Sequence, residues 1–239
     1  LKKRWGEEIM ARSYDVVIMN PPFTRQERLP PNYKNLLFDR FKRHKSYLHG
    51  QLGYYGYFVL LADRFVHTEG RMALVLPATV LRVKSCEGIR RLWAENYHVE
   101  HIITTWHRSA FSESTRFREI LLVAKKGKPD PKAKTVVTVI KTLPTTLEEA
   151  REIAEAIRNS KSDWGDWRLA VKIHDYSKLI RDTSNWFKYI AVRDLGLLDK
   201  LDMLLDSEKL IPFSHVAEAQ RIDLEHLKFK DFHGFILYN

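Results

Sequence analysis

The chain has 239 residues with 44% hydrophobic and 12% aromatic content, which suffices for a packed core and excludes a collagen-like or wholly disordered chain. Its single cysteine excludes an internal disulfide and a cysteine-based zinc cluster, and it favours a reducing, cytoplasmic location. A net charge of +10 favours a polyanionic partner, although an ordinary basic surface has the same balance. Because the apolar runs are only strand-length, no membrane partner is expected.

The first quarter of the chain predicts a helix, a strand and a long basic segment. Residues 2–12 have the spacing of an amphipathic helix, and residues 14–19 form an apolar run typical of a strand buried on both faces of a parallel sheet. The strand ends at Asn20-Pro21-Pro22, because proline removes backbone donors. Residues 24–57 are polar and strongly basic, and part of this segment, 35–48, has a helical pattern.

Strands and helices alternate through the residues that follow. Apolar residues over 57–65 recur at helical spacing, and Gly70 is expected to cap that helix. Further strands are predicted over 71–76, 99–105, 119–124 and 135–141, and further helices over 84–96, 145–158 and 193–206. Thr145 and Glu148 predict a capping box. This alternation predicts an α/β fold with crossover connections, in which the second and third of these strands could instead be an antiparallel pair at the sheet edge.

Asn20-Pro21-Pro22-Phe23 is the motif that carries chemistry. The exocyclic amine of adenine is a poor nucleophile, because its lone pair is delocalised into the ring. The side-chain carbonyl of Asn20 and the main-chain carbonyl of Pro21 can accept hydrogen bonds from such an amine, and the two prolines keep the corner stiff. Phe23 offers an aromatic face to a flipped base, which is worth about 1–3 kcal/mol. The alternative is a corner that merely ends the strand.

The segment Tyr14-Asp-Val-Val-Ile-Met-Asn-Pro-Pro-Phe23 resembles the amino-methyltransferase family, and within it the N6-adenine-specific DNA methyltransferases of restriction–modification systems. The similarity continues over 57–81 and, weakly, over 111–125. It implies a partial Rossmann-like methyltransferase sheet made of the later strands, followed by a mainly helical segment and the start of a target-recognition module. The expected parts are a catalytic portion at 1–126, a strand plus helical connector at 127–211, and the beginning of a target-recognition domain at 212–239.

The resemblance also implies roles for residues of the motif. The methyl donor would be S-adenosylmethionine, with Asn20 contacting both the donor and the target amine, and Pro21 accepting from the same amine. Phe23 would stack on the base, which Pro22 and Phe111 would also contact; the alternative for Phe111 is a loop aromatic packed into the core. The glycine-rich cofactor loop of the family has no counterpart in this sequence, which has no Gly-x-Gly. We therefore expect the main donor-binding loop to lie outside this chain and the chain alone to be inactive.

Basic residues that follow the corner are expected to contact the phosphates of double-stranded DNA, the alternative being a solvated charged helix. They are Arg25, Arg28, Arg40, Lys42 and Arg43. Sequence recognition is expected to belong to a separate specificity domain or subunit. The histidines have no carboxylate at ligand spacing, so no metal site is predicted.

These observations favour part of an adenine-specific DNA methyltransferase. Two other functions remain open at this point. The same tetrapeptide serves methylation of RNA or of a protein amide, although the long basic insertion at 24–57 favours DNA. A nucleic-acid-binding fragment without chemistry, in which the Pro-Pro corner is structural, is the alternative from another class.

Overall fold

The computed structural model describes residues 13–24, 29–107, 110–112 and 118–191, together with residues 197, 200 and 203. The chain divides into two compact units, residues 1–198 and 199–239, and every element described below belongs to the first. The helix expected over 2–12 and the module expected from residue 212 lie outside the described residues. Of the helix expected over 193–206, the three isolated described residues are helical.

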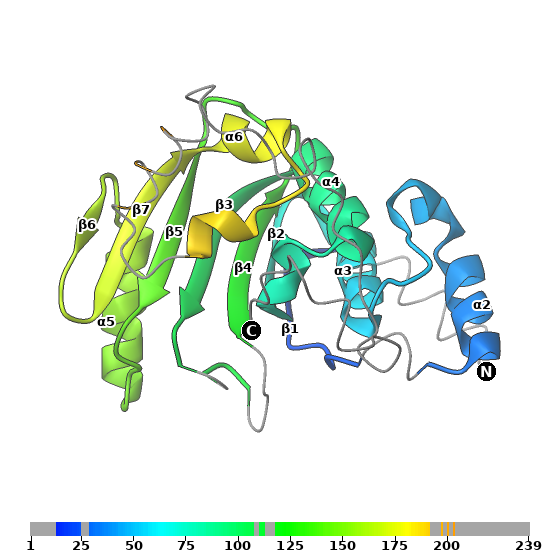
Figure 1. The fold of residues 1–239 in the computed structure, drawn as a ribbon, viewed down its shortest axis with the longest axis horizontal. Helices are drawn as coiled ribbons and strands as arrows, with labels where there is room; N and C mark the ends of the chain where they lie inside the picture. Colours follow the sequence, from blue (N-terminus) through cyan, green and yellow to red (C-terminus); the bar gives the residue numbers. More distant parts are fainter. Residues whose placement is uncertain are drawn as a thin grey trace, which may run out of the picture. The chain divides into compact units, whose positions relative to one another are not determined.

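Seven strands form one mixed sheet in the order β1-β2-β4-β3-β5-β7-β6 (Figure 1). They are β1 (Tyr14–Met19), β2 (Val66–Pro77), β3 (Tyr97–Thr105), β4 (Glu119–Lys126), β5 (Lys134–Ile140), β6 (Trp164–Gly165) and β7 (Leu169–Asp175). The pairs β1–β2 and β3–β5 are parallel, whereas β4 and β7 run antiparallel to their neighbours. The carboxyl ends of β1, β2, β3 and β5 therefore share one sheet edge with the first residues of β4 and β7. The predicted α/β class is confirmed.

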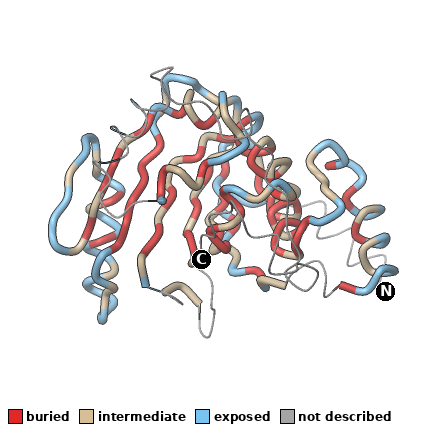
Figure 2. Tube along the Cα trace, in the orientation of Figure 1, coloured by how far each residue is buried: buried red, intermediate tan, exposed pale blue. Residues whose placement is uncertain are grey.

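Helices cover both faces of this sheet. The α-helices are α2 (Pro31–Arg40), α3 (Tyr54–Phe65), α4 (Glu87–Asn96), α5 (Leu147–Arg158) and α6 (Tyr176–Arg181); short 3-10 helices are η2 (Lys42–Tyr47), η3 (Ala78–Leu81), η4 (Lys84–Cys86) and η5 (Phe187–Ile190). Val137 packs into the main core cluster with residues of α3, α4 and α6, whereas its neighbour Val136 packs with Ile153 and Ile157 of α5. Since successive strand residues point to opposite faces, α5 lies on the other side of the sheet. Figure 2 shows the buried strands between exposed helix surfaces.

The junction between α3 and β2 differs from the sequence prediction. The helix ends at Phe65 and β2 starts at once with Val66, so Gly70 lies within the strand and does not cap a helix. The register against β1 jumps from Val66 to Arg71, and Glu69 in this bulge has a φ of +70°. A β-carbon on Gly70 would come within 2.9 Å of a backbone oxygen of β1, which explains the glycine better than a cap does.

Strand β1 is an edge strand of the described sheet, with apolar side chains in the open. Val16 is 55% exposed and Ile18 is 76% exposed, although the sequence predicts a strand buried on both faces. Within β1 only Val17 is buried, and the half-buried Met19 packs against the same main core. Among the described residues β1 pairs with β2 alone and packs against α3.

Strand β4 also lies elsewhere than expected. It is antiparallel to β3, which the sequence allowed, but it sits between β2 and β3 in the interior of the sheet. The sequence did not predict the very short strand β6 or the longer strand β7, because their apolar pattern is irregular. Because β5 and β7 extend the same sheet, both sides of the expected boundary at residue 126 contribute to it. The division into functional domains stays a prediction.

Helix α5 has the predicted capping box displaced by one residue. Thr146 and Glu149 form it, with the Thr146 hydroxyl accepting from the Glu149 amide at 3.2 Å. Ile153 and Ile157 are buried against the sheet, whereas Leu147 at the first position is exposed. Within the described residues, none of the helices is long and apolar enough to cross a membrane.

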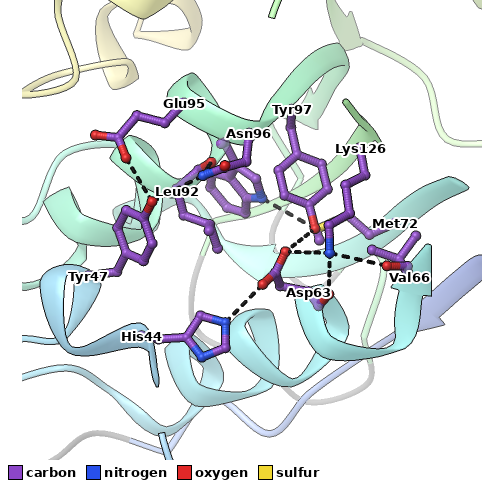
Figure 3. Close-up of polar contacts among 11 residues, drawn as sticks. His44, Tyr47, Asp63, Val66, Met72, Leu92, Glu95, Asn96, Tyr97 and Lys126 are labelled. Atoms are coloured by element: carbon purple, nitrogen blue, oxygen red, sulfur yellow. Dashed lines mark hydrogen bonds and ion pairs between the residues drawn. The ribbon is translucent and has the colours of Figure 1, made fainter. Parts of the chain in front are cut away.

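A buried polar network ties four elements together around Asp63 on α3 (Figure 3). One carboxyl oxygen lies 2.8 Å from Nε2 of His44 on η2, and the other accepts from the Tyr97 hydroxyl of β3 at 2.6 Å. The Lys126 ammonium at the end of β4 lies 3.0 Å from the same carboxyl and donates to the main-chain oxygens of Asp63 and Val66. Burial opposes ionisation of Asp63, but the hydrogen bonds from His44, Tyr97 and Lys126 outweigh it and lower the pKa to about 2.

We predict that Asp63→Asn destabilises the chain in a pH-dependent way. Because the pKa falls from 3.8 to about 2 on folding, the ionised carboxyl contributes about 2 kcal/mol above pH 4, and this contribution is lost as the pH falls from about 4 toward 2. Urea unfolding between pH 7 and pH 3 should show the gap between wild type and variant closing with acid. Asp39→Asn, at an exposed position of α2, serves as the control; a gap independent of pH would contradict the assignment.

Candidate active site

The Asn-Pro-Pro-Phe corner lies at the sheet edge where the parallel strands end. Asn20 directly follows β1 and is exposed, whereas Pro21 is buried and Pro22 is exposed again. Pro77, the last residue of the neighbouring strand β2, is paired with Glu119 of β4, so the starts of antiparallel strands meet the same edge. Open α/β sheets bind ligands outside the carboxyl ends of their strands, and this edge therefore has the position of a ligand site.

The loop between β3 and β4 contacts Asn20 through Ser112. The Ser112 hydroxyl lies 3.2 Å from the Asn20 side-chain nitrogen and 3.3 Å from its side-chain oxygen. The amides of Phe111 and Ser112 donate to one carboxyl oxygen of Glu119, at 2.9 and 3.2 Å. The sequence analysis missed Ser112 and Glu119, because nothing in the local pattern relates them to a residue more than 90 positions away.

Two aromatic side chains of the predicted site are partly packed against the protein. Phe23 makes an edge-to-face contact with Tyr55 of α3, with ring centroids 6.5 Å apart, and is only partly buried. The ring of Phe111 packs against the second core cluster, which contains residues of β5, α5 and β7, and this is the alternative considered for it. A base contact by either ring stays a prediction.

Arg118 stabilises the same edge of the sheet, and its role was not predicted from the sequence. It donates to Thr104 Oγ1 at 3.2 Å and to the main-chain oxygen of Ile190 at 2.6 Å, and its guanidinium lies 4.3 Å from the Trp106 ring centroid. Burial lowers the pKa of this guanidinium to about 10, so it stays charged at neutral pH. Arg118 thus fixes the ends of β3 and β4 relative to each other.

The basic segment forms α2 and η2, and its cations point outward. Arg40, Lys42 and Arg43 are exposed, as the DNA prediction requires, whereas Arg25 and Arg28 lie outside the described residues. Arg64 of α3 adds to this surface: burial lowers its pKa first, and the nearby positive charges of Arg43 and Arg40 lower it further. These neighbouring guanidinium groups make the surface positively charged, which favours an anionic partner.

Buried contacts hold the basic segment on the sheet domain. His44 binds Asp63, and Phe41 packs against Tyr57 with ring centroids 5.6 Å apart. At the end of η2, the Tyr47 hydroxyl donates to Glu95 at 2.7 Å and accepts from Asn96 at 3.0 Å (Figure 3). A β-carbon on Gly88 would collide with the backbone of Tyr47 at 2.1 Å, so the close approach of η2 to α4 requires glycine there.

The comparisons with known proteins agree with this geometry. Residues 2–111 match the family model of the Eco57I restriction-modification methylase, so the matched part ends at Phe111 and contains the whole corner. The resemblance to restriction–modification methyltransferases is confirmed. No curated protein matches the chain.

Solved structures of restriction–modification proteins share much of this fold. The type IIG restriction endonuclease BpuSI is 19% identical, with a TM-score of 0.60 over 77% of this chain and 21% of that one. The methyltransferase subunit of a type I restriction-modification system from Streptococcus thermophilus is 15% identical, with a TM-score of 0.51 over 72% of this chain and 37% of that one. The chain thus spans well under half the length of either structure.

The described residues contain no glycine-rich turn of the kind that holds a nucleotide cofactor. Asn20 stands at the corner, but none of the described glycines forms a Gly-x-Gly turn after a strand, and the full sequence has none either. Within the part of the chain that is described, no group of three histidine, cysteine, aspartate or glutamate side chains gathers in the manner of a metal site. The polar side chains that the structure places beside Asn20 are those of Ser112 and Glu119.

Proposed function

We propose that this chain supplies the target-base side of an N6-adenine DNA methyltransferase active site, as part of a longer restriction–modification protein. The observation that carries the proposal is the Asn-Pro-Pro-Phe corner at the carboxyl end of β1, at the edge where the parallel strands end. The match of residues 2–111 to a restriction-modification methylase family supports it.

Asn20 and Pro21 would act on the amine of the target base. Their carbonyl oxygens would accept hydrogen bonds from its two N–H groups, so that positive charge developing on the nitrogen during methyl transfer meets fixed dipoles. The rigid proline corner keeps these acceptors in place, which lowers the reorganisation needed in the transition state. Phe23, held edge-on by Tyr55, would stack on the flipped base, and Pro22 and Phe111 would contact it.

S-adenosylmethionine, which supplies an electrophilic methyl group, would be the donor. This chain has no glycine-rich cofactor loop, so we propose that residues outside it form most of the donor site and that the chain alone is inactive. Of the residues present, Asn20 would lie closest to the reacting methyl group.

Double-stranded DNA would be the substrate, bound through the exposed cations of α2 and η2. Arg40, Lys42 and Arg43 lie on a segment that follows the corner directly and is fixed to the sheet domain, so they can meet phosphates beside a flipped base. This basic surface favours DNA over a protein amide as substrate. Sequence recognition would come from a specificity domain or subunit.

We predict that Asn20→Ala in the full-length protein abolishes methyl transfer and leaves DNA binding intact. The variant removes an acceptor for the target amine, and such groups are worth about 100-fold to 1000-fold in rate. Methylation of adenine-containing duplexes and fluorescence anisotropy on the same DNA measure the two effects separately. Methylation at the wild-type rate would contradict the proposal. It would support the alternative, a DNA-binding fragment in which the corner is only structural.

We further predict that Arg40→Gln, Lys42→Gln and Arg43→Gln together weaken DNA binding equally on all sequences. Each lost phosphate contact should reduce the slope of log affinity against log salt concentration by about one. Three exposed cations elsewhere, Arg151, Arg158 and Lys161, changed to glutamine give a variant of the same net charge. If both triple variants lower the slope alike, net charge and not this surface drives binding.

A further inference from the structure

Glu119 is a buried carboxyl group at the edge that carries the candidate active site. It is the first residue of β4 and only 1% exposed, and its backbone pairs with Pro77 at the end of β2. The main-chain oxygen of Glu119 accepts from Thr104 Oγ1 at 3.1 Å. The residue is thus fixed by the sheet itself and not by a loop.

The carboxyl group of Glu119 holds two consecutive loop amides. Its Oε2 accepts from the amides of Phe111 and Ser112 at 2.9 and 3.2 Å, while its Oε1 is buried with no hydrogen-bond partner among the described residues. Burying a carboxyl group with one oxygen unpaired is unfavourable by itself. The hydrogen bonds from the two loop amides to Oε2 therefore explain why a glutamate stands at this position.

By binding the Ser112 amide, Oε2 of Glu119 holds the Ser112 hydroxyl beside Asn20. The Ser112 hydroxyl is 3.2 Å from Nδ2 and 3.3 Å from Oδ1 of Asn20, so the exposed amide presents both of its polar atoms to one hydroxyl. Either orientation of the amide keeps one hydrogen bond to Ser112. Rotation of the amide plane away from Ser112 would break that contact.

We propose that Glu119 and Ser112 are positioning residues for methyl transfer: Glu119 clamps the loop, and Ser112 holds the Asn20 amide at the angle that the target amine requires. This inference rests on the proposed function. An exposed asparagine otherwise samples several rotamers, and only some of them direct its carbonyl at the nitrogen of the base. Fixing the amide before the base arrives removes that reorganisation from the reaction, so the benefit falls on the rate and not on DNA affinity.

The test is methyl transfer by variants of the full-length protein. Ser112→Ala should lower kcat about tenfold, because the Asn20 amide loses its fixed orientation, with the Kd for DNA unchanged. Ser112→Thr, which keeps the hydroxyl, should restore most of the rate. Ser162→Ala is the matched control, because Ser162 is exposed and its side chain makes no hydrogen bond within the described residues.

Variants at Glu119 separate the clamp from general packing. Glu119→Gln keeps an acceptor for the two amides and should retain most of the rate, whereas Glu119→Met removes it and should lower kcat as Ser112→Ala does. The double variant Ser112→Ala/Glu119→Met should fall no further than Ser112→Ala, since both changes break one chain of contacts. Additive losses, or a wild-type kcat in Ser112→Ala, would overturn the inference.

Amide hydrogen exchange keeps this inference distinct from the proposed function. In Glu119→Met the Phe111 and Ser112 amides should exchange faster than in wild type, and in Glu119→Gln they should not. If wild type methylates adenine and Ser112→Ala does so equally well, the positioning role fails and the proposed function stands. If wild type bearing its donor does not methylate DNA, the proposed function fails and the positioning role fails with it, whatever the exchange rates.

Discussion

The largely buried carboxyl group of Asp63 makes the hydrogen bonds on which the arrangement of this domain depends. It receives hydrogen bonds from η2, β3 and β4 while sitting on α3, so one charge joins elements that are distant in sequence. A carboxylate taken out of water is strongly unfavourable unless each lone pair has a donor, and here His44, Tyr97 and Lys126 supply them. Because His44, Tyr97 and Lys126 share this one acceptor group, Asp63 holds η2, β3 and β4 in a single arrangement around α3.

That constraint matters for chemistry because the basic surface and the catalytic corner belong to different elements. His44 lies one residue beyond Arg43, so the contact that satisfies Asp63 also fixes where the cations of η2 stand relative to the sheet. From the corner side, the Tyr54 amide donates to the main-chain oxygen of Thr24 at 3.0 Å, which ties the start of α3 to the residue after Phe23. Helix α3 thus contacts both the corner and the basic segment, and it sets the spacing between them.

How far the sequence predicts this structure depends on the range of the forces involved. The Asn20 corner, the parallel strands and the helix α5 follow from local periodicity and proline chemistry, and all three are present, with the capping box displaced to Thr146. The interior position of β4 and the short strands β6 and β7 depend on pairing between distant segments, which periodicity does not report. Glycine is common both at helix caps and in β-bulges, so the sequence pattern alone did not distinguish these roles for Gly70. The close approach of the β1 backbone shows that Gly70 belongs to the bulge.

The candidate site divides in the same way between local and distant contributions. Apart from Phe111, the groups that would touch the base stand together in one tetrapeptide. The groups that orient them, Ser112 and Glu119, lie 92 positions or more further along the chain. A side chain that accepts a hydrogen bond from the target amine or stacks on its ring needs a particular chemical type, so its residue type can be recognised in a motif. A side chain that positions another needs only a hydrogen-bonding atom at the right place, and many residue types provide one. Positioning residues therefore become visible only when the fold brings them beside the group they hold.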